Sequence, residues 1–375
     1  MSLKKILFCA STASHITNFH MPYLEQFKKQ GYEVHTIANK TISSPFVDCS
    51  YEAVFDKHNL SFQNILSVFQ IAKRIKQERY SVISSHATLA GAILRLAVLI
   101  SGDKEVVVIH TSHGYLFKSI LGFKDMLYLL VEKILKICTD LLITMNQEDF
   151  EIAKKHRLCK KIKFIDGCGL ISEKFPNLSE AEITKIKEEY GINQNQRVIL
   201  CVGEFSKRKN QEFLIQGFVA VVARNPNVMI LFAGEGVLQA HCQLLVNGLS
   251  LAKRILFCGY VQRINNLYRV ADIVVSTSLS EGLPFNIMEA LNCHIPVVAS
   301  RVKGHTDLLV DGVNGLIFDV DDGESLTSCL QKLLENTAVY EQIKSNSVLK
   351  RKYYIEDVKP QMMELYNKVI NCKRE

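Results

Sequence analysis

The fold class is decided by one stretch of the chain, Val198-Ile199-Leu200-Cys201-Val202-Gly203-Glu204-Phe205-Ser206-Lys207-Arg208-Lys209-Asn210. Its first five residues are apolar without alternation, which predicts a strand covered on both faces, as in a parallel sheet. A glycine follows the strand, and a helical pattern begins at Gln211. Strand, turn and helix form the repeating unit of doubly wound α/β proteins, which bind ligands beyond the carboxyl ends of their strands.

The same alternation runs along the whole chain. We predict strands over residues 5–9, 34–38, 82–84, 106–110, 141–144, 198–202, 228–232, 255–258, 273–277, 297–300 and 316–318. Helices are predicted over 19–29, 65–78, 89–100, 124–137, 180–190, 211–223 and 285–292. A glycine- and proline-containing linker near 170–180 divides these elements. The expected architecture is α/β, with two Rossmann-like parallel-sheet domains, 1–175 and 176–354. A final helical segment, 355–375, interrupted by Pro360, is expected to pack back on the first domain.

Composition and length exclude several classes of protein. The eleven cysteines include no CxxC pair and no zinc-like cluster with histidine, which favours buried thiols in a reducing compartment. The apolar stretch 89–100 contains Arg95 and is shorter than the roughly 20 residues of a membrane-spanning helix. No secretory signal pattern follows the first strand. We therefore expect a cytoplasmic protein.

The net charge of +7 is unevenly distributed. Residues 1–180 contain 23 Lys and Arg against 17 Asp and Glu, whereas residues 181–375 contain 22 against 21. A basic first half fits an anionic substrate or the anionic inner face of a membrane, with peripheral association. Ordinary solvated charge is the alternative. No nucleic acid partner is expected.

The turn after strand 198–202 is suited to binding phosphate. Gly203 allows close approach of the backbone, and the cations Lys207, Arg208 and Lys209 precede a helix N-terminus with unpaired N–H groups. The alternative is a solvated turn. No GxxxxGK[ST] string is present, so the chain is not a P-loop NTPase, and no GxGxxG follows the first strand, which disfavours a dehydrogenase.

A second motif follows strand 273–277. Glu281 lies in a loop, Pro284 suits the first turn of the next helix, and Glu289 lies inside that helix. Carboxylates at these places can accept hydrogen bonds from sugar hydroxyls. The alternative is that Glu281 caps the helix and Glu289 is a surface residue.

Four histidines follow strands of the first domain: His15, His20, His86 and His113. Histidine is costly to bury unpaired, so this grouping suggests the polar wall of a cleft. For any one of them alone, a structural role is the alternative.

The sequence resembles glycosyltransferase family 4, which has the GT-B fold, in the branch that builds capsular and exopolysaccharides. The second-domain strings that carry the resemblance are 203–210, 281–290 (the E-x7-E pattern), 295–300 and 311–315. In the first domain they are 14–20, 85–91 and 111–117.

The resemblance implies roles for these residues. His113, Glu281 and Lys209 would be catalytic, with His113 near the reacting sugar. The donor would contact Gly203, Arg208, Lys209, Tyr260, Val261, Glu281, Gly282, Leu283, Pro284, Phe285, Asn286 and Glu289, the last of these through the ribose hydroxyls. The acceptor side would comprise His15, His20, His86, His113 and Gly114.

The resemblance also implies the reaction. A hexose or N-acetylhexosamine would pass from a nucleotide diphosphate donor, UDP in the first instance, to a polyprenyl-diphosphate-linked glycan. The anomeric configuration would be retained by front-face attack, without metal or other cofactor. A GT-B nucleotide-sugar epimerase and a non-catalytic donor-binding subunit remain alternatives.

One position departs from the family pattern. Glu204 stands where many members have arginine, and a carboxylate cannot bind a diphosphate. Either Arg208 supplies the guanidinium, or Glu204 has a different role. Asp319-Val320-Asp321 is a DxD string, the metal motif of the other major glycosyltransferase fold. It follows a short predicted strand and is interpreted as a loop that starts a helix.

Overall fold

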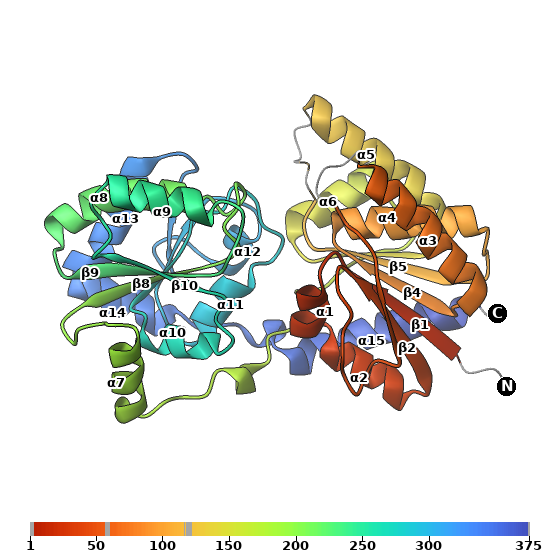
Figure 1. The fold of residues 1–375 in the computed structure, drawn as a ribbon, viewed down its shortest axis with the longest axis horizontal. Coiled ribbons are helices and arrows are strands. Elements are labelled where there is room, and N and C mark those ends of the chain that lie inside the picture. Colours follow the sequence, from red (N-terminus) through yellow and green to blue (C-terminus); the bar gives the residue numbers. More distant parts are fainter. Residues whose placement is uncertain (1–3, 57–60, 116, 118–121, 374–375) are drawn as a thin grey trace. The chain divides into compact units, whose positions relative to one another are not determined.

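The structure, a computed structural model, describes residues 4–56, 61–115, 117 and 122–373. The chain forms two compact units (Figure 1). Unit 1 comprises Met1–Gly169 and Ile355–Glu375, and unit 2 comprises Leu170–Tyr354. The chain passes from unit 1 to unit 2 at Gly169–Leu170, whereas the sequence prediction put this boundary between residues 175 and 176.

Unit 1 contains, within its described residues, a seven-stranded sheet of order β3-β2-β1-β4-β5-β6-β7. All neighbouring strands are parallel. The strands are β1 (Lys4–Cys9), β2 (Tyr32–Ala38), β3 (Cys49–Glu52), β4 (Val82–His86), β5 (Val107–Ser112), β6 (Leu141–Thr144) and β7 (Ile162–Phe164). The central strands are buried along their whole lengths, as expected of a parallel sheet that is covered on both faces.

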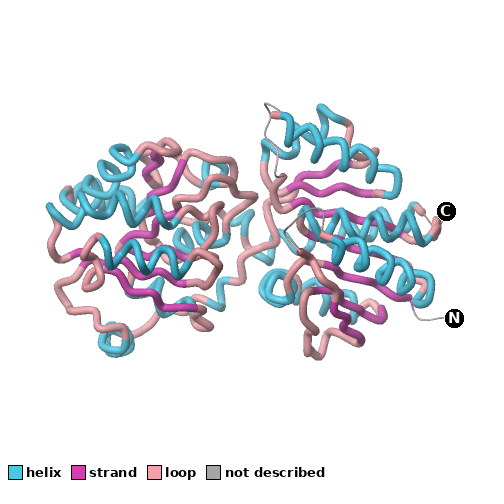
Figure 2. The backbone as a smooth tube through the Cα atoms, turned by 45° about the horizontal axis from the view of Figure 1, so that its top comes forward, coloured by secondary structure: helices cyan, strands magenta, loops and turns pink. Residues whose placement is uncertain are grey.

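Helices cover both faces of this sheet (Figures 1 and 2). The helices of unit 1 are α1 (Ala13–Phe19), α2 (Met21–Lys29), α3 (Phe62–Glu78), α4 (Thr88–Ser101), α5 (Phe123–Leu135), α6 (Gln147–His156) and α15 (Ile355–Cys372). One core packs α3 and α4 against β1, β4 and β5. On the other face, Phe27 of α2 contacts both Phe8 of β1 and Tyr366 of α15. The last helix is therefore part of the core of unit 1.

Unit 2 repeats the plan with six parallel strands among its described residues, in the order β10-β9-β8-β11-β12-β13. The strands are β8 (Arg197–Val202), β9 (Val228–Ala233), β10 (Ile255–Gly259), β11 (Ile273–Ser276), β12 (Val297–Ser300) and β13 (Leu316–Phe318). The helices are α7 (Glu180–Glu189), α8 (Gln211–Arg224), α9 (Gln239–Gly248), α10 (Ile264–Val270), α11 (Phe285–Asn292), α12 (His305–Leu308), α13 (Gly323–Glu335) and α14 (Thr337–Asn346). The two faces of the sheet have separate cores. One core contains α7, α10 and α11, and the other contains α8, α9 and α13.

Both sheets confirm the predicted fold class, two parallel-sheet α/β units. In each, the strand order reverses beside the first strand: between β1 and β4 in unit 1, and between β8 and β11 in unit 2. Loops after such neighbours diverge to opposite faces of the sheet, so a crevice opens at the carboxyl ends of the strands. Many of the predicted site residues follow these strands, whereas His113 follows β5, and Tyr260 and Val261 follow β10.

Three local predictions were wrong. Residues 19–29 were expected to form one helix, but α1 ends at Phe19 and α2 starts at Met21, because His20 lies between them and Pro22 suits a helix start. Strand β4 runs on to His86, so this histidine ends the strand rather than following it. Helix α15 continues through Pro360, which removes one backbone N–H donor from the helix without ending it.

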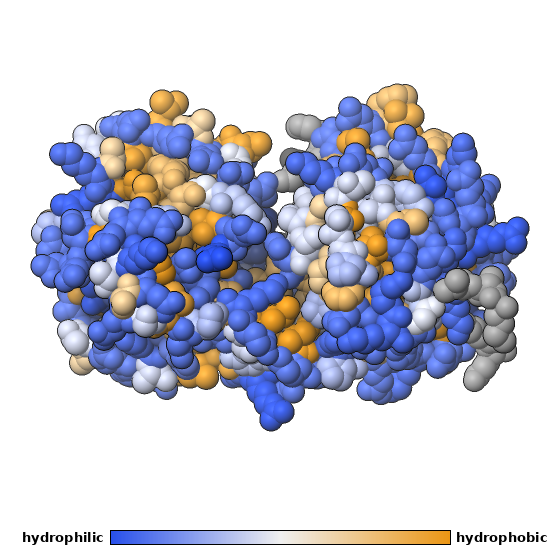
Figure 3. Space-filling view, turned by 60° about the horizontal axis from the view of Figure 1, so that its bottom comes forward, coloured by the Kyte–Doolittle hydropathy of each residue, from blue (hydrophilic) through white to orange (hydrophobic). Residues whose placement is uncertain are grey.

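The face of the molecule in Figure 3 is mostly hydrophilic, with smaller hydrophobic patches between the polar side chains. In the part of the chain that the structure describes, no helix combines the length and apolar character needed to cross a membrane.

Candidate active site

The phosphate-binding turn of unit 2 lies between β8 and α8. Gly203 has no side chain, and the methylene groups of Lys209 occupy the space instead, since a Cβ on Gly203 would lie 3.1 Å from Cε of Lys209. The turn is held from the side by Gly234 and Gly236, whose Cβ atoms would collide with the backbone of Gly203 and Phe205. The string Gly234-Glu235-Gly236 therefore supports the turn by close backbone packing.

The loop after β11 is joined to this turn. The hydroxyl of Thr277 donates to the carbonyl oxygens of Lys209 and Asn210 at 3.0 and 2.9 Å, and the N–H of Leu279 donates to the carbonyl of Arg208 at 2.8 Å. The two loops meet because β8 and β11 are neighbours at the strand-order reversal. This brings together residues that lie about 70 positions apart in sequence.

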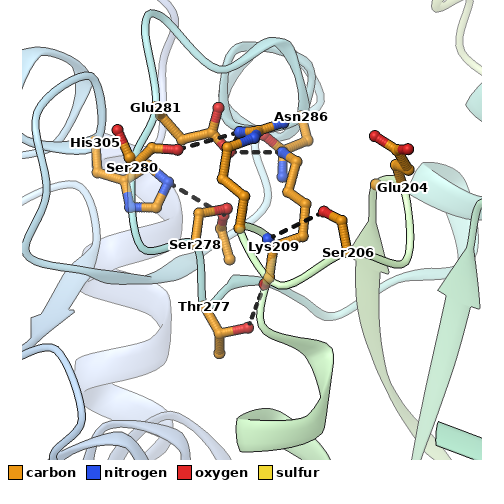
Figure 4. A network of polar contacts seen from close by, with 12 residues as sticks. Glu204, Ser206, Lys209, Thr277, Ser278, Ser280, Glu281, Asn286 and His305 are labelled. Carbon is orange, nitrogen blue, oxygen red and sulfur yellow. Dashed lines mark hydrogen bonds and ion pairs between the residues drawn. The ribbon is translucent and has the colours of Figure 1, made fainter. Parts of the chain in front are cut away.

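Glu281 is the centre of the resulting cluster (Figure 4). Its Oε1 atom lies 2.7 Å from Nζ of Lys209 and 2.8 Å from Nη1 of Arg208. The carboxylate is buried, whereas Arg208 is partly exposed and also donates to the carbonyl of Ser280 at 3.1 Å. Burial disfavours the charged carboxylate, but the charges of Lys209 and Arg208 outweigh burial and lower the pKa of Glu281 to about 2.

His305 is linked to the start of the Glu281 loop through two serines, Ser276 and Ser300. It is completely buried at the start of α12, with Nδ1 2.8 Å from the carbonyl of Ser300 and Nε2 3.1 Å from the hydroxyl of Ser276. The hydroxyl of Ser300 in turn donates to the carbonyl of Ser278, at the start of the loop. Burial lowers the pKa of His305 to about 4, so the imidazole is neutral at physiological pH.

Glu289 lies on α11, close to the end of β8. Its Oε2 atom lies 2.7 Å from the hydroxyl of Tyr268 on α10, and the amide of Asn286 donates to the carbonyl of Val202 at 3.2 Å. Burial raises the pKa of Glu289 above its usual value, while the hydrogen bond from Tyr268 opposes the rise. The other carboxylate oxygen of Glu289, Oε1, is suited to accept hydrogen bonds from a diol.

The remaining donor-side predictions lie in two places, the loop after Glu281 and the loop after β10. The loop after Glu281 consists of Gly282, Leu283 and Pro284 and leads into α11, which begins with Phe285. A Cβ on Gly304 would collide with the carbonyl of Gly282, so this loop packs closely against the start of α12. Tyr260 and Val261 follow β10, which is separated from β8 by β9. Tyr260 is exposed, while Val261 packs on a core.

Two charged features noted in the sequence, Glu204 and the DxD string at 319–321, lie outside this cluster. Glu204 is exposed, and it is Arg208 that pairs with the carboxylate beside Lys209. In the DxD string, Asp319 pairs with Arg301 at 2.6 Å after β13, and Asp321 has a positive φ of 64°.

In unit 1, the structure brings the four predicted histidines together. His15 lies on α1, His20 between α1 and α2, His86 at the end of β4, and His113 directly after β5. The ring centroids of His20 and His86 are 3.9 Å apart, and those of His15 and His113 are 4.5 Å apart. We name these four residues the histidine cluster.

A chain of hydrogen bonds backs His113. Its Nε2 lies 3.2 Å from Nδ1 of His86, whose Nε2 lies 2.9 Å from the hydroxyl of Ser84. The hydroxyl of Ser84 also contacts the hydroxyl of Tyr366 on α15 at 2.5 Å. This chain fixes the ring orientation of His113, which therefore depends on the last helix of the sequence.

Burial lowers the pKa of all four histidines, and their mutual repulsion lowers those of His20, His86 and His113 further. Next to the cluster, Gly114 has a φ of 129°, which favours glycine, and the N–H of Tyr115 donates to buried Asp149 at 2.9 Å. Leu116, in the string that carried the resemblance, lies outside the described residues.

Sequence reasoning missed four supporting residues: Ser84, Tyr268, His305 and Tyr366. Ser84 shares a strand face with His86 two positions on, and His305 follows strand β12, so the rule of inspecting residues after strands could have found both. Tyr268 and Tyr366 act from helices, where a tyrosine at helical spacing is indistinguishable from a core residue.

Comparisons with known proteins agree with this geometry. Residues 5–146 match the family described as "Glycosyl transferase 4-like", and residues 182–349 match "Glycosyl transferases group 1". EpsD of Bacillus subtilis (strain 168), which its name assigns to the glycosyltransferases, is 31% identical over 332 residues, 88% of this chain and 87% of its own. The UDP-Gal:alpha-D-GlcNAc-diphosphoundecaprenol alpha-1,3-galactosyltransferase of Escherichia coli is 27% identical over 305 residues, 78% of this chain and 77% of its own.

Solved structures share the fold. Anabaena Alr3699/HepE in complex with UDP superposes with a TM-score of 0.75 at 19% identity, over 98% of this chain and 100% of that one. WaaG, a glycosyltransferase involved in lipopolysaccharide biosynthesis, superposes with a TM-score of 0.76 at 13% identity, over 96% and 99%. Matches to both units, together with 31% identity across most of the length of EpsD, show that this chain belongs to the family 4 glycosyltransferases, which have the GT-B fold.

Proposed function

We propose that this glycosyltransferase moves a hexose or N-acetylhexosamine from a UDP-sugar to a polyprenyl-diphosphate-linked glycan in capsule or exopolysaccharide synthesis, with retention of anomeric configuration. The observation that carries the proposal is the pairing of Lys209 and Arg208 with Glu281 at the strand-order reversal of unit 2. Cations, a buried carboxylate and a helix N-terminus meet there, which suits a diphosphate that is attached to a sugar.

Cleavage of the anomeric C–O bond leaves negative charge on the departing diphosphate. Lys209 and Arg208 supply two fixed positive charges, and the N–H groups at the starts of α8 and α11 point toward the same end of the sheet. Fixed charges of this kind need no reorganisation when the bond breaks, and such electrostatic preorganisation is often the largest catalytic contribution. No divalent ion on the diphosphate is required in this scheme.

The two carboxylates have separate tasks. Glu281, ionised and held by two cations, accepts hydrogen bonds from the donor-sugar hydroxyls, and Glu289, held by Tyr268, accepts them from the ribose. Neither is placed as a glycosidase-type acid or nucleophile. Front-face attack by the acceptor hydroxyl, with the leaving phosphate taking the proton, therefore accounts for retention.

The acceptor and the donor base are proposed from relatives. The Escherichia coli relative acts, by its name, with UDP-Gal on a diphosphoundecaprenol-linked sugar, and the HepE structures contain UDP, with glucose or UDP-glucose in two of them. The histidine cluster of unit 1 supplies the acceptor-side wall, with His113 beside the reacting sugar. Its neutral imidazoles can both donate and accept hydrogen bonds with hydroxyl groups.

Peripheral membrane association follows from a lipid-linked acceptor. Helix α5 exposes Met126, Leu127, Leu130 and Ile134, each about half exposed or more, and Lys133 lies on the same helix. Apolar residues flanked by lysine suit the boundary between headgroups and acyl chains. We expect binding of the full chain to anionic vesicles to weaken as salt rises.

The test is release of nucleotide diphosphate from a panel of UDP-sugars, without added Mg²⁺ or Mn²⁺, with and without a synthetic polyprenyl-diphosphate sugar. Release should rise with the acceptor and should be lost in Glu281→Gln but not in Glu324→Gln, an exposed control on α13. Conversion of one UDP-sugar into its epimer without release would instead indicate an epimerase. Binding without turnover across the panel would indicate a donor-binding subunit.

A further inference from the structure

We propose that His15, His20 and His113 of unit 1 form a binding site for a transition-metal ion of the zinc type. This site shares its histidines with the acceptor-side wall proposed above, and it places no metal on the donor diphosphate. The three residues come from α1, from the junction of α1 and α2, and from the loop after β5.

The geometry of the three rings suits one shared ion. One nitrogen from each imidazole lies within 4.8 Å of the other two. The ring centroids are 5.3 Å (His15 to His20), 4.5 Å (His15 to His113) and 5.7 Å (His20 to His113) apart. Three imidazoles around a tetrahedral zinc ion, with Zn–N about 2.0–2.1 Å, have centroids about 5 Å apart. The separations of the ring centroids therefore match those expected around one shared ion.

Two of the three side chains have a buried nitrogen in need of a partner. Nε2 of His15 and Nε2 of His20 are both buried and have no hydrogen-bond partner among the described residues. His20 is only 2% exposed. Leaving a buried polar atom unpaired costs about 1–3 kcal/mol. A metal ion would satisfy both nitrogens at once.

The third side chain, His113, has the kind of supporting hydrogen bond that metal-binding histidines make. Such residues almost always use their second ring nitrogen in a hydrogen bond that fixes the ring. In His113 this nitrogen is Nε2, which lies 3.2 Å from His86, and it leaves Nδ1 for the ion. Both nitrogens of His86 are occupied, by His113 and Ser84, so His86 supports the site without being a ligand.

The ligand set selects the class of ion. Imidazole nitrogens suit Zn²⁺, Co²⁺, Ni²⁺ and Cu²⁺, whereas Mg²⁺ and Ca²⁺ prefer oxygen. Three protein ligands leave a fourth position for an oxygen ligand, such as a hydroxyl or phosphate oxygen. A second group of candidate ligands, Glu33, His35 and Cys49, lacks this availability, because the two nitrogens of His35 already contact Tyr80 at 2.9 Å and Glu33 at 2.8 Å.

The experiment uses the untagged full-length protein after treatment with a chelator. Co²⁺ is titrated by visible absorption and Zn²⁺ by calorimetry. We expect one equivalent of each ion, with the absorption of nitrogen-ligated tetrahedral Co²⁺. His15→Gln and His20→Gln should each weaken binding by about 100-fold, at or above the 10–100-fold typical of losing a mere supporting group. His241→Gln, an exposed histidine on α9, is the matched control and should bind as the wild type does.

The wild type alone provides a test that does not depend on the folding of any variant. Zn²⁺ should raise its melting temperature at concentrations where Mg²⁺ does not, because an ion that binds only the folded state stabilises it. Absence of stoichiometric binding, or binding that survives in the His15→Gln/His20→Gln double variant, would overturn the proposal. Since none of these readouts uses glycosyl transfer, they can fail while the proposed function holds, and the reverse.

Discussion

The hydroxyl of Tyr268 lies 2.7 Å from Oε2 of Glu289, and this contact joins helix α10 to α11 beside the end of β8. Tyr268→Phe keeps the aromatic ring and removes the hydroxyl, which donates to Glu289 and also to the carbonyl of Asn286 at 3.1 Å. A hydrogen bond to a charged group contributes about 1.5–3 kcal/mol, so the KM for the donor should rise by about 10- to 100-fold. Initial-rate kinetics with varied donor measure this. Tyr340→Phe, which loses a hydroxyl contact with Asp272 elsewhere in unit 2, is the control and should leave KM unchanged.

Lys209 is predicted to act chiefly in the transition state. Lys209→Met keeps the length of the side chain that fills the space above Gly203 but removes the charge. Loss of one preorganised group costs about 10²–10³ in kcat, and we expect a fall of this size in steady-state kinetics. Lys207→Met, at an exposed position two residues earlier, should reduce kcat by less than threefold or so, as screened surface charges contribute little. Equal effects of the two substitutions would contradict the assignment.

Arg208 shares the carboxylate of Glu281 with Lys209, which supports its proposed role in place of an arginine at position 204. Whether it contacts the donor remains a prediction, and the kinetics of Arg208→Gln beside those of Lys209→Met would decide it.

Tyr366 is expected to position His113 through Ser84 and His86. In Tyr366→Phe the chain of hydrogen bonds loses its far end, and the ring orientation of His113 is less firmly fixed. We predict a fall in kcat of about tenfold with little change in the KM for the nucleotide sugar, because the donor-binding residues lie in unit 2. A change confined to donor KM would argue against the positioning role. Tyr353→Phe, whose hydroxyl contacts the carbonyl of Asp307, is a control.

The buried histidines make the fold sensitive to acid. The pKa of His305 is about 4 in the folded protein and about 6.5 when unfolded, so between these values the unfolded chain binds more protons. The free energy of unfolding therefore falls as the pH falls through this window, by at most about 1.4 kcal/mol per pH unit for one histidine. Urea unfolding at pH 7 and pH 5 measures this. Between the two pH values, the free energy of unfolding of His305→Asn should fall by about 1–2 kcal/mol less than that of the wild type. His241→Asn should lose as much as the wild type.

Two glycines in helices should respond oppositely to alanine. Glycine inside a helix is usually about 1 kcal/mol worse than alanine. At Gly91 in α4, however, an added Cβ would lie 2.8 Å from Nδ1 of buried His110, so Gly91→Ala should lower the free energy of unfolding by about 1–3 kcal/mol. At Gly248 in α9, no atom lies within 4 Å of the added Cβ, so Gly248→Ala should be neutral or stabilising. Chemical denaturation measures both.

The buried strands and α11 were predictable because their sequences carry strong signals. The strands 141–144, 297–300 and 316–318 and the helix 285–292 agree with the structure at both ends. The edge strands β3 and β7 were missed, since Cys49–Glu52 and Ile162–Phe164 are short and mix polar with apolar residues. Helix α6 was also missed, although Asn146 caps it and acidic residues begin it, because its apolar face is narrow.

The candidate site was predictable only as a set of residues after strands. The sequence indicates that Lys209 and Glu281 each follow a strand, but their contact depends on β8 and β11 being neighbours, which is a property of the strand order. His20 follows β1 and His86 ends β4, and their contact likewise depends on these two strands being neighbours. Supporting residues on helices, such as Tyr268, carry no signal in one sequence.

Helix α15 has a consequence for biosynthesis. Its residues Met362, Tyr366 and Ile370 are buried in unit 1, yet they are translated after all of unit 2. While the ribosome is still making residues 170–354, one face of the β-sheet of the first half lacks α15, and Phe27 lacks its contact with the ring of Tyr366. Unit 2 can thus complete its native packing before unit 1, which must wait for α15 to emerge from the ribosome.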